Sequence, residues 1–361
     1  MNIIINQKKL LEAIHTVEHV VSKNISLPIL TTILLRAEGG KLKLTATNLE
    51  IGIQVWVGAR VEKEGVVAVP ARIFSDFVSS VQDEKLTITS EQNSIFLTSE
   101  NYKTQILGMV PDEFPLIPIV AHAQKVAFPG VELGKALASV VDAASLLETR
   151  PELSGVYIHI AAKQATFAAT DSFRLSEYIL PGNYPVEKSC ILPRITALEI
   201  LRLATGRQET VHLNIGENQV GFGGNEVELV SRLIDGRYPD YKKVIPERSV
   251  AEFTVEKQIL EQHVRMAGIF SSSISDLVLK LASGALHVMA KNSDRGEIAS
   301  KIPVSSKAAF SVSVNYRYLL DALKVIQQQE VEVVHTGEGS PLIIRGKGNT
   351  QHTYVIMPLR A

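Results

Sequence analysis

Apolar residues recur at helical spacing in two stretches of the chain, separated by steps of four, three and four positions. The first stripe consists of Leu10, Ile14, Val17 and Val21. The second stripe, 123 residues later, consists of Leu133, Leu137, Val140 and Ala144. The pattern predicts two helices that each bury one face, and the common offset indicates that the chain repeats itself.

Other landmarks share this offset of 123 residues. Pro70 follows the apolar run VVAV, and Pro193 follows CIL at the same distance. A fainter third copy is in phase, with Asn315 where the prolines stood. The offset is the size of a small domain and far longer than solenoid periods of roughly 20–50 residues. We therefore predict three similar domains, over residues 1–122, 123–248 and 249–361.

The pattern also predicts that each domain consists of two similar halves, because segments with helical periodicity begin near residues 7, 70, 132, 193, 256 and 315. Between them lie alternating segments such as KLKLTATNLEIGIQVWV, punctuated by turn residues such as Gly39-Gly40 and the glycine-rich stretch Gly221–Gly224. We expect each half-domain to hold one helix and about four antiparallel strands. The predicted class is α+β, with two helices packed on antiparallel sheets in each domain.

Composition limits the function classes. The 361 residues are 45% hydrophobic and 21% charged, which is ordinary for a globular protein. A single cysteine, Cys190, excludes an internal disulfide framework and any site with several cysteine ligands. The N-terminus has no signal-peptide pattern and no run is long enough to span a membrane, so we expect a cytoplasmic protein.

Catalytic motifs are not found in the sequence. There is no GxxxxGK[ST], no HExxH and no nucleophile elbow. His263 has no second ligand one helical turn away, Asp171-Ser172 has no base placed near it by the sequence, and Cys190 lies in an apolar segment. We expect a protein that is not an enzyme, with no catalytic residues, metal site or cofactor.

The net charge of −1 argues against binding nucleic acid by bulk charge. Three equivalent domains suggest rotational symmetry, and two chains joined head to tail would close a ring of six domains. A hole lined by helices with a mild positive bias suits a duplex, whose phosphates are contacted without regard to sequence. Topology would then hold the DNA, and strong affinity would not be needed.

Several segments in order resemble the bacterial DNA polymerase III beta subunit family, the beta sliding clamps. They are SLPILTTILLRAEGGKLKLTATNLEI, AVPARIFSDFV, DEFP, ATDSFRLSE, DGRYPDYKKVIP, VNYRYLLDAL and the terminal YVIMPLR. The resemblance runs from end to end of the chain. It implies half of a closed six-domain ring, formed by a head-to-tail homodimer around double-stranded DNA, which confers processivity on the replicative polymerase. It also implies an ATP-driven clamp loader, the DNA polymerase III alpha subunit and other proteins with a clamp-binding motif as partners, and a location at the nucleoid.

The resemblance further implies a pocket that receives short peptides from these partners. Its expected residues are Leu153, Thr170, Ser172, Phe173, Arg174, Leu175, Pro239, Lys243, Val244, Pro341, Leu342, Val355, Ile356, Met357, Pro358, Leu359 and Arg360. Read from the residues alone, the run YVIMP favours a core strand over a binding groove, and only the resemblance reverses this preference. Phe173 stands where the family often has His or Tyr, and Ala361 ends the chain where some members have a larger apolar residue, so the preferred peptide sequence stays open.

Two further sets follow from the resemblance. The residues expected to face DNA are Lys23, Asn24, Arg72, Arg150, Arg194 and Arg202. The residues expected at the junction between subunits are Gln105, Ile106 and Leu107 on one side and Ile269 and Phe270 on the other. Leu147 stands where some members have a polar contact to DNA. The alternative is a scaffold protein built from the same three repeats that does not encircle DNA.

Overall fold

The computed structural model describes the chain except residues 23–26, 148, 247–249, 307 and 360–361. Contacts divide the chain into two compact units. The first unit contains Met1–Val131 and Arg202–Leu233. The second unit contains Glu132–Leu201 and Ile234–Ala361. The chain crosses between them, so each unit is assembled from two separate segments.

Six α-helices lie in the described part of the chain, and each begins directly after a β-strand. They are α1 (Gln7–Glu18), α2 (Ala71–Ser80), α3 (Gly130–Val140), α4 (Arg194–Ala204), α5 (Lys257–Ile269) and α6 (Tyr316–Val325). Every predicted helix start is confirmed to within two residues. The repeat is visible at the junctions, because Pro70 and Pro193 end the strands before α2 and α4, and Asn315 ends the strand before α6. Asn315 also caps α6, since its Oδ1 accepts a hydrogen bond from the Arg317 N–H at 2.9 Å.

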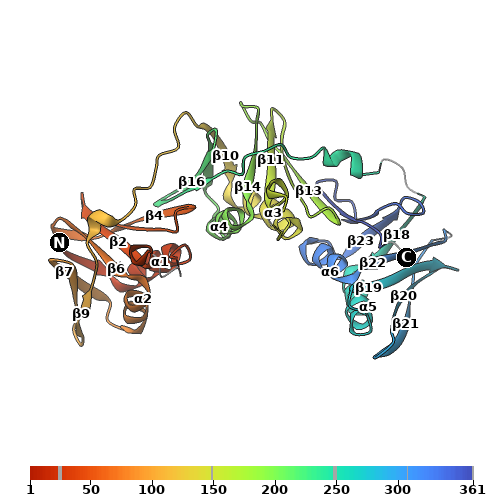
Figure 1. The fold of residues 1–361 in the computed structure, drawn as a ribbon, viewed down its shortest axis with the longest axis horizontal. Helices are drawn as coiled ribbons and strands as arrows, with labels where there is room; N and C mark the ends of the chain where they lie inside the picture. Colours follow the sequence, from red (N-terminus) through yellow and green to blue (C-terminus); the bar gives the residue numbers. More distant parts are fainter. Residues whose placement is uncertain (23–26, 148, 247–249, 307, 360–361) are drawn as a thin grey trace. The chain divides into compact units, whose positions relative to one another are not determined.

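The first unit contains two antiparallel sheets. One has the order β5-β1-β7-β8-β9 and the other β10-β15-β16-β17-β4-β3-β2-β6. Their bounds are β1 (Asn2–Asn6), β2 (Thr32–Glu38), β3 (Lys41–Thr47), β4 (Ile51–Gly58), β5 (Arg60–Lys63), β6 (Gly65–Pro70), β7 (Lys85–Glu91), β8 (Ser94–Thr98), β9 (Lys103–Leu107), β10 (Gln124–Pro129), β15 (Thr210–Ile215), β16 (Gln219–Gly224) and β17 (Val227–Arg232). Figure 1 shows α1 and α2 side by side on the strands of this unit.

The second unit also contains two antiparallel sheets. One has the order β14-β11-β12-β13-β25-β24-β23-β18 and the other β21-β20-β19-β22. Their bounds are β11 (Gly155–Ala161), β12 (Gln164–Thr170), β13 (Arg174–Pro181), β14 (Lys188–Pro193), β18 (Ala251–Glu256), β19 (Asp276–Ala282), β20 (Ala285–Asn292), β21 (Gly296–Pro303), β22 (Phe310–Asn315), β23 (Glu330–His335), β24 (Leu342–Gly346) and β25 (His352–Ile356). Helices α5 and α6 pack against each other beside these strands (Figure 1). The predicted α+β class with antiparallel sheets is confirmed.

The helices cover the sheets through the predicted apolar stripes. Leu10, Ile14 and Val17 of α1 are fully buried, as are Leu133 and Leu137 of α3. Burial of one such side chain stabilises the fold by roughly 1.5–3 kcal/mol. The ends of both stripes differ from the prediction, because Val21 and Ala144 lie beyond the last helical residues, Glu18 and Val140.

One of the predicted hairpin turns is found at its predicted position, and another lies a few residues further along the chain. Gly39 and Gly40 both have positive φ, at 56° and 77°, and join β2 to β3 as a two-residue turn of the kind that favours glycine. The glycine-rich stretch Gly221–Gly224, in contrast, lies inside β16, and the turn that follows is made by Asn225 and Glu226. The expectation of a turn at the glycines was wrong by a few residues, because glycine in a strand leaves room for neighbouring side chains, here Val120 against Gly221.

The terminal strand β25 is part of a core and not an exposed tail. It lies between β13 and β24 in the eight-stranded sheet. Because side chains alternate along a strand, Tyr354 and Ile356 join the apolar cluster that contains α5 and α6, whereas Val355 faces a second cluster with Leu153 and Leu175. The second cluster lies next to the cavity described below.

Candidate functional site

A cavity of about 220 Å³ opens on the second unit beside β13 and β25. It is lined by Arg150, Leu153, Thr170, Ser172, Arg174, Leu175, Pro239, Asp240, Tyr241, Val244, Val355 and Met357. Its polar groups come mainly from the turn before β13 and from the segment around η5 (Tyr241–Val244). Apolar walls with a few polar groups at the rim are typical of a site that binds a small ligand or a peptide side chain.

The apolar floor is set by strand register. Leu175 of β13 lies opposite Val355 of β25, and both are buried at 3% and 1% exposure. Leu153, at the end of η4 (Pro151–Leu153), is buried beside them. Ile343 of β24 packs in the same cluster from the far side. The floor therefore depends on the packing of the sheet.

The turn between β12 and β13 is held by its own side chains. Thr170 Oγ1 donates to the Arg174 carbonyl at 2.6 Å and accepts from the Ser172 N–H at 3.1 Å. Asp171 Oδ1 accepts from the Phe173 N–H at 2.9 Å. Ser172 has a positive φ of 77°, an uncommon conformation for a residue with a side chain. The turn is thus fixed from within.

Phe173 and Met357 are joined through the backbone at the edge of the cavity. The Met357 N–H donates to the Phe173 carbonyl at 2.8 Å, which extends the β13–β25 pairing by one bond. The Phe173 side chain is 59% exposed and does not line the cavity. Met357 is half-buried and does line it.

Arg174 lines the cavity, but its side chain is occupied by contacts within the protein. Its Nε donates to Asp171 Oδ2 at 2.9 Å, and its Nη1 forms an ion pair with Asp321 of α6. The guanidinium lies 4.6 Å from the centre of the Tyr318 ring, and its side chain is only 11% exposed. A guanidinium with two carboxylate partners and a ring stabilises the wall of the cavity more than it offers free donors.

Behind the cavity lies a cluster of tyrosines. Tyr241 donates from its hydroxyl to Glu177 Oε2 at 2.6 Å, and both residues are buried. Burial, together with this hydrogen bond, raises the pKa of Tyr241. The ring of Tyr157 stacks on that of Tyr238 with centroids 4.9 Å apart. These rings fix the position of the Pro239–Val244 segment, which forms one side of the cavity.

Nine of the residues predicted for the pocket line this one cavity. They are Leu153, Thr170, Ser172, Arg174, Leu175, Pro239, Val244, Val355 and Met357. Of the others, Phe173, Lys243, Pro341, Leu342, Ile356, Pro358 and Leu359 do not line it. Leu342 and Ile356 face each other across β24 and β25 and are fully buried in the core beside α5 and α6. Arg360 lies outside the described residues.

Three lining residues were not predicted for the pocket. Arg150 was predicted to face DNA; it also lines the cavity and pairs with Glu152 at 3.2 Å. Asp240 and Tyr241 were quoted only within DGRYPDYKKVIP. Asp240 pairs with Lys243 at 2.9 Å. The spacing of three residues between an acid and a base was the sequence signal that could have indicated this pair. Lys243 itself is 81% exposed.

Three of the residues predicted to face DNA, Arg72, Arg194 and Arg202, lie on helices. Arg72 on α2 is 95% exposed and only 3.9 Å from its neighbour Asp76. Arg194 begins α4 and pairs with Asp142 at 3.4 Å. Arg202 near the end of α4 donates to the Thr16 carbonyl at 2.7 Å. Lys23 and Asn24 lie outside the described residues.

The residues predicted at the subunit junction lie at sheet edges and helix ends. Gln105, Ile106 and Leu107 belong to β9, the last strand of its sheet. Leu107 is 71% exposed, whereas Ile106 points inward at 4%. Ile269 ends α5 at 61% exposure, and Phe270 follows it as the C-cap. Each set contains an exposed apolar side chain that could pack against another molecule.

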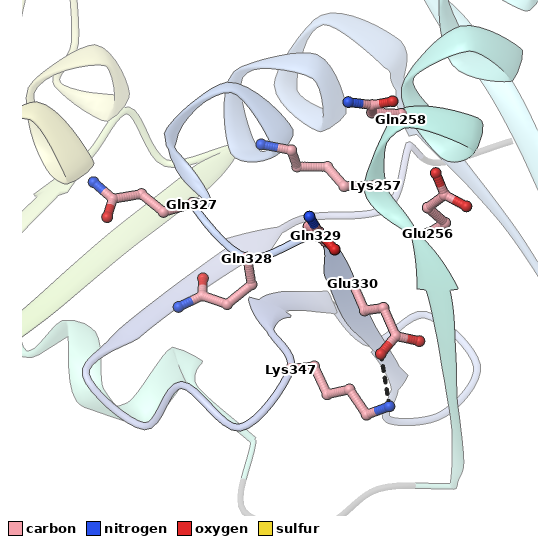
Figure 2. Close-up of a pocket in the computed structure, with 8 residues that line it drawn as sticks. All are labelled: Glu256, Lys257, Gln258, Gln327, Gln328, Gln329, Glu330 and Lys347. Atoms are coloured by element: carbon pink, nitrogen blue, oxygen red, sulfur yellow. Dashed lines mark hydrogen bonds and ion pairs between the residues drawn. The ribbon is translucent and has the colours of Figure 1, made fainter.

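A second, polar pocket of about 760 Å³ lies where the start of α5 meets the segment Gln327–Glu330. Figure 2 shows one ion pair among its charged groups, between the Glu330 carboxylate and the Lys347 amine, at 2.8 Å. Lys257 donates to the Ile326 carbonyl at 2.7 Å. This pocket has neither the apolar floor of the first one nor any predicted site residue.

The residues considered for chemistry are placed as follows. Burial raises the pKa of the Cys190 thiol to about 12, so the sulfur stays protonated and unreactive. His263 Nδ1 lies 2.8 Å from Ser300 Oγ, so its ring has a polar contact within the protein. Across the described ranges, no three or more His, Cys, Asp or Glu side chains come together as metal ligands. Within the same ranges, no helix has the length and apolar content needed to cross a membrane.

Comparison with known proteins matches all three parts of the chain. Family models of the DNA polymerase III beta subunit match residues 1–118 (N-terminal domain), 128–240 (central domain) and 242–360 (C-terminal domain). The chain is 28% identical over 355 residues to the beta sliding clamp of Staphylococcus aureus, covering 94% of each chain. It is also 28% identical to that of Synechocystis, covering 100% of this chain and 99% of the relative. The crystal structure of the DNA polymerase III subunit beta from Pseudomonas aeruginosa superimposes with a TM-score of 0.96 at 25% identity, covering 100% of both chains.

Proposed function

The chain belongs to the DNA polymerase III beta subunit family, the DNA sliding clamps, and on that premise we propose how it holds DNA and its partners. As a sliding clamp it encircles duplex DNA without sequence specificity and confers processivity on the replicative polymerase. We assign its three clamp domains to residues 1–122, 123–248 and 249–361. Two chains would supply the six domains of the closed ring.

The ring is proposed to hold DNA by topology and not by grip. A net charge of −1 is far from the basic excess of proteins that bind nucleic acid by affinity. Arg72, Arg194 and Arg202, on helices, are proposed to contact phosphates, and such contacts carry no sequence information. Lys23 and Asn24 are proposed for the same surface. Weak contacts of this kind let the ring slide.

The cavity beside β13 and β25 is proposed as the site for partner peptides. The observation that carries this proposal is the apolar floor of Leu153, Leu175 and Val355, already formed and accessible from the surface. Short apolar side chains of a peptide would fill it, and the residues of its rim would orient the peptide backbone. The partners are the DNA polymerase III alpha subunit, the clamp loader and other proteins with a clamp-binding motif. Phe173, Lys243, Pro341, Pro358, Leu359 and Arg360 are proposed to extend the site beyond the cavity.

The junction between subunits is proposed to join β9 of one copy to the end of α5 of a second copy. Strand β9 has a free edge within its sheet, and pairing across a junction would cover it. Leu107 and Ile269 are the exposed apolar side chains that would meet there. A head-to-tail contact of this kind closes a ring when the rotation permits it.

The protein is inferred to act without catalytic chemistry or a cofactor, in the cytoplasm and at the nucleoid. Two polar side chains that line the cavity are bound to other residues of the protein. Arg174 is paired with Asp171 and Asp321, and Tyr241 is hydrogen-bonded to Glu177.

Retention on DNA of different topology tests the proposed function. The purified protein is loaded on nicked circular DNA, separated from free protein, and compared before and after the circle is cut once. A ring that encircles DNA stays on the circle and is lost from the linear form. Equal retention on the two forms would support the alternative, a three-repeat scaffold that does not encircle DNA.

A further inference from the structure

Asp142 bridges two cations that come from different helices. It lies in η3 (Val141–Ala143), directly after α3. Its Oδ1 is 3.4 Å from Arg194 Nη2, and its Oδ2 is 2.9 Å from Lys324 Nζ. Arg194 is the first residue of α4, and Lys324 lies in the last turn of α6. One carboxylate therefore occupies both a guanidinium and an ammonium group.

The three side chains are accessible to solvent. The side chains of Asp142, Arg194 and Lys324 are 30%, 28% and 69% exposed. The hydrogen bond to Asp142 raises the pKa of Lys324, so the lysine carries its charge throughout the physiological range. Ion pairs at such exposure are weak and exchange readily for another anion. A phosphate that approached this surface would compete with Asp142 for both cations.

Other cationic side chains on the neighbouring helices have different partners. Arg317 at the start of α6 is exposed and stacks loosely over Tyr316, at 5.9 Å. Arg265 of α5 is held by Glu261 at 2.5 Å, one turn before it. Arg194 and Lys324 differ from these two arginines because they share one carboxylate, Asp142, which belongs to neither of their helices. A substitution of Asp142 therefore releases both cations.

We propose that Asp142 limits the grip of this surface on DNA by holding Arg194 and Lys324 against capture by phosphates. The inference rests on the proposed function, since it takes Arg194 to face the duplex. Its consequence is mechanical: a clamp must bind DNA weakly enough to move along it, and an acid that competes with phosphate keeps the contacts short-lived. Asp142 is thus a positioning residue that acts through two cations and touches no substrate itself.

The variant Asp142→Asn removes the competing charge and nearly keeps the shape. Free of the carboxylate, each cation gains roughly two- to fivefold in effective affinity for phosphate at low salt. Each added phosphate contact steepens the dependence of log K on log salt by about 0.9. The matched control is Asp112→Asn, which makes the same charge change in η2 (Pro111–Glu113) at an exposed position.

The experiment measures anisotropy of a labelled 30-base-pair duplex with full-length protein at several salt concentrations, and diffusion of loaded protein on long DNA. We expect Asp142→Asn to bind more tightly, with a steeper salt slope and slower diffusion, and Asp112→Asn to match the parent. Asp142→Glu should restore the parent slope.

Equal affinity and slope for parent and Asp142→Asn would overturn the inference, and a lower melting temperature alone would assign Asp142 to a structural tie between helices. If Asp142→Asn does not fold, Asp142→Ser supplies the second test, because it also removes the carboxylate and should raise DNA affinity and steepen the salt slope. Parent-like affinity in Asp142→Ser would contradict the idea that Asp142 holds these two cations. Loss of retention on circular DNA by the parent protein would instead refute the proposed function.

Discussion

Leu175 and Val355 lie opposite each other across the β13–β25 pair, and both line the same cavity. They come from positions 180 residues apart in the sequence, so the cavity exists only when the eight-stranded sheet is complete. Binding of a peptide here therefore depends on the sheet register as much as on the side chains. The first prediction concerns the rim of this cavity, where side chains can be changed without disturbing the sheet.

Met357→Ala should weaken peptide binding and leave the fold intact. Met357 is half-buried, and only its backbone N–H takes part in the pairing with Phe173. Loss of its apolar contact should cost about 1–2 kcal/mol, or roughly a tenfold rise in Kd. Fluorescence anisotropy with a labelled peptide from the polymerase alpha subunit measures this. Met266→Ala on α5, 48% exposed and outside the cavity, is the control and should bind as the parent does. An unchanged Kd for Met357→Ala would remove this residue from the site.

Arg174→Ala should destabilise the protein because it leaves two carboxylates without their common partner. Asp171 and Asp321 both bind this guanidinium, and Asp171 is only 15% exposed. We expect a loss of about 1–3 kcal/mol in the free energy of unfolding, measured by urea denaturation. Adding Asp321→Asn to Arg174→Ala should recover part of the loss, since one unpaired charge disappears. If the double variant were as unstable as the sum of the single ones, the ion pair would not be the cause.

The pair of substitutions Leu107→Ala and Ile269→Ala should shift the protein from dimer toward monomer. Their side chains are 71% and 61% exposed in the single chain, so their truncation should barely change the stability of the fold. Sedimentation velocity at micromolar concentration measures the mass. Leu116→Ala, 94% exposed on a segment outside the predicted junction, should remain dimeric. A double variant that stays a dimer at the lowest measurable concentration would contradict the proposed junction.

The helices and the repeat could be predicted because they depend on local patterns. A single sequence displays the helical spacing of Leu10, Ile14 and Val17 and the constant offset between Pro70 and Pro193. The cavity could not be derived in this way. From the residues alone the run YVIMP favours a core strand, and only the resemblance favours a groove. In the structure, Ile356 faces the core and Val355 faces the cavity.

The sequence alone also could not predict which charged side chains pair with each other. Arg174 pairs with Asp321, which lies 147 residues away on α6. Arg150 is predicted from the resemblance to face DNA, and its place in the lining of the cavity was not predicted. Long-range pairing of this kind depends on how sheets and helices pack, which local spacing does not encode. The resemblance supplied the residues of the pocket, and the structure separated those of the floor from those of the core.

The buried His352 should make stability fall in mild acid. Its Nε2 lies 3.0 Å from Ser176 Oγ, and this hydroxyl donates to the Ser139 carbonyl at 2.7 Å, so the imidazole is the donor to Ser176. Burial lowers the pKa of His352 to about 4, below its ordinary value of 6.5. Between pH 6.5 and about 4, the unfolded chain therefore binds a proton at His352 that the folded chain does not bind. The stabilising contribution is complete above pH 6.5 and is lost progressively as the pH falls to about 4.

The full loss should be on the order of 3 kcal/mol, because one pKa unit corresponds to about 1.4 kcal/mol. Urea denaturation at pH 7.0, 5.5 and 4.5 measures it, with His352→Gln as the comparison. Glutamine keeps a donor for Ser176 but does not titrate, so the variant should be less sensitive to pH between 6.5 and 4.5. Burial also lowers the pKa of His335, and some sensitivity should remain in the variant for that reason. Identical pH profiles for parent and variant would show that His352 is not the group that titrates, and that the strand pair β13–β25 does not depend on its neutral form.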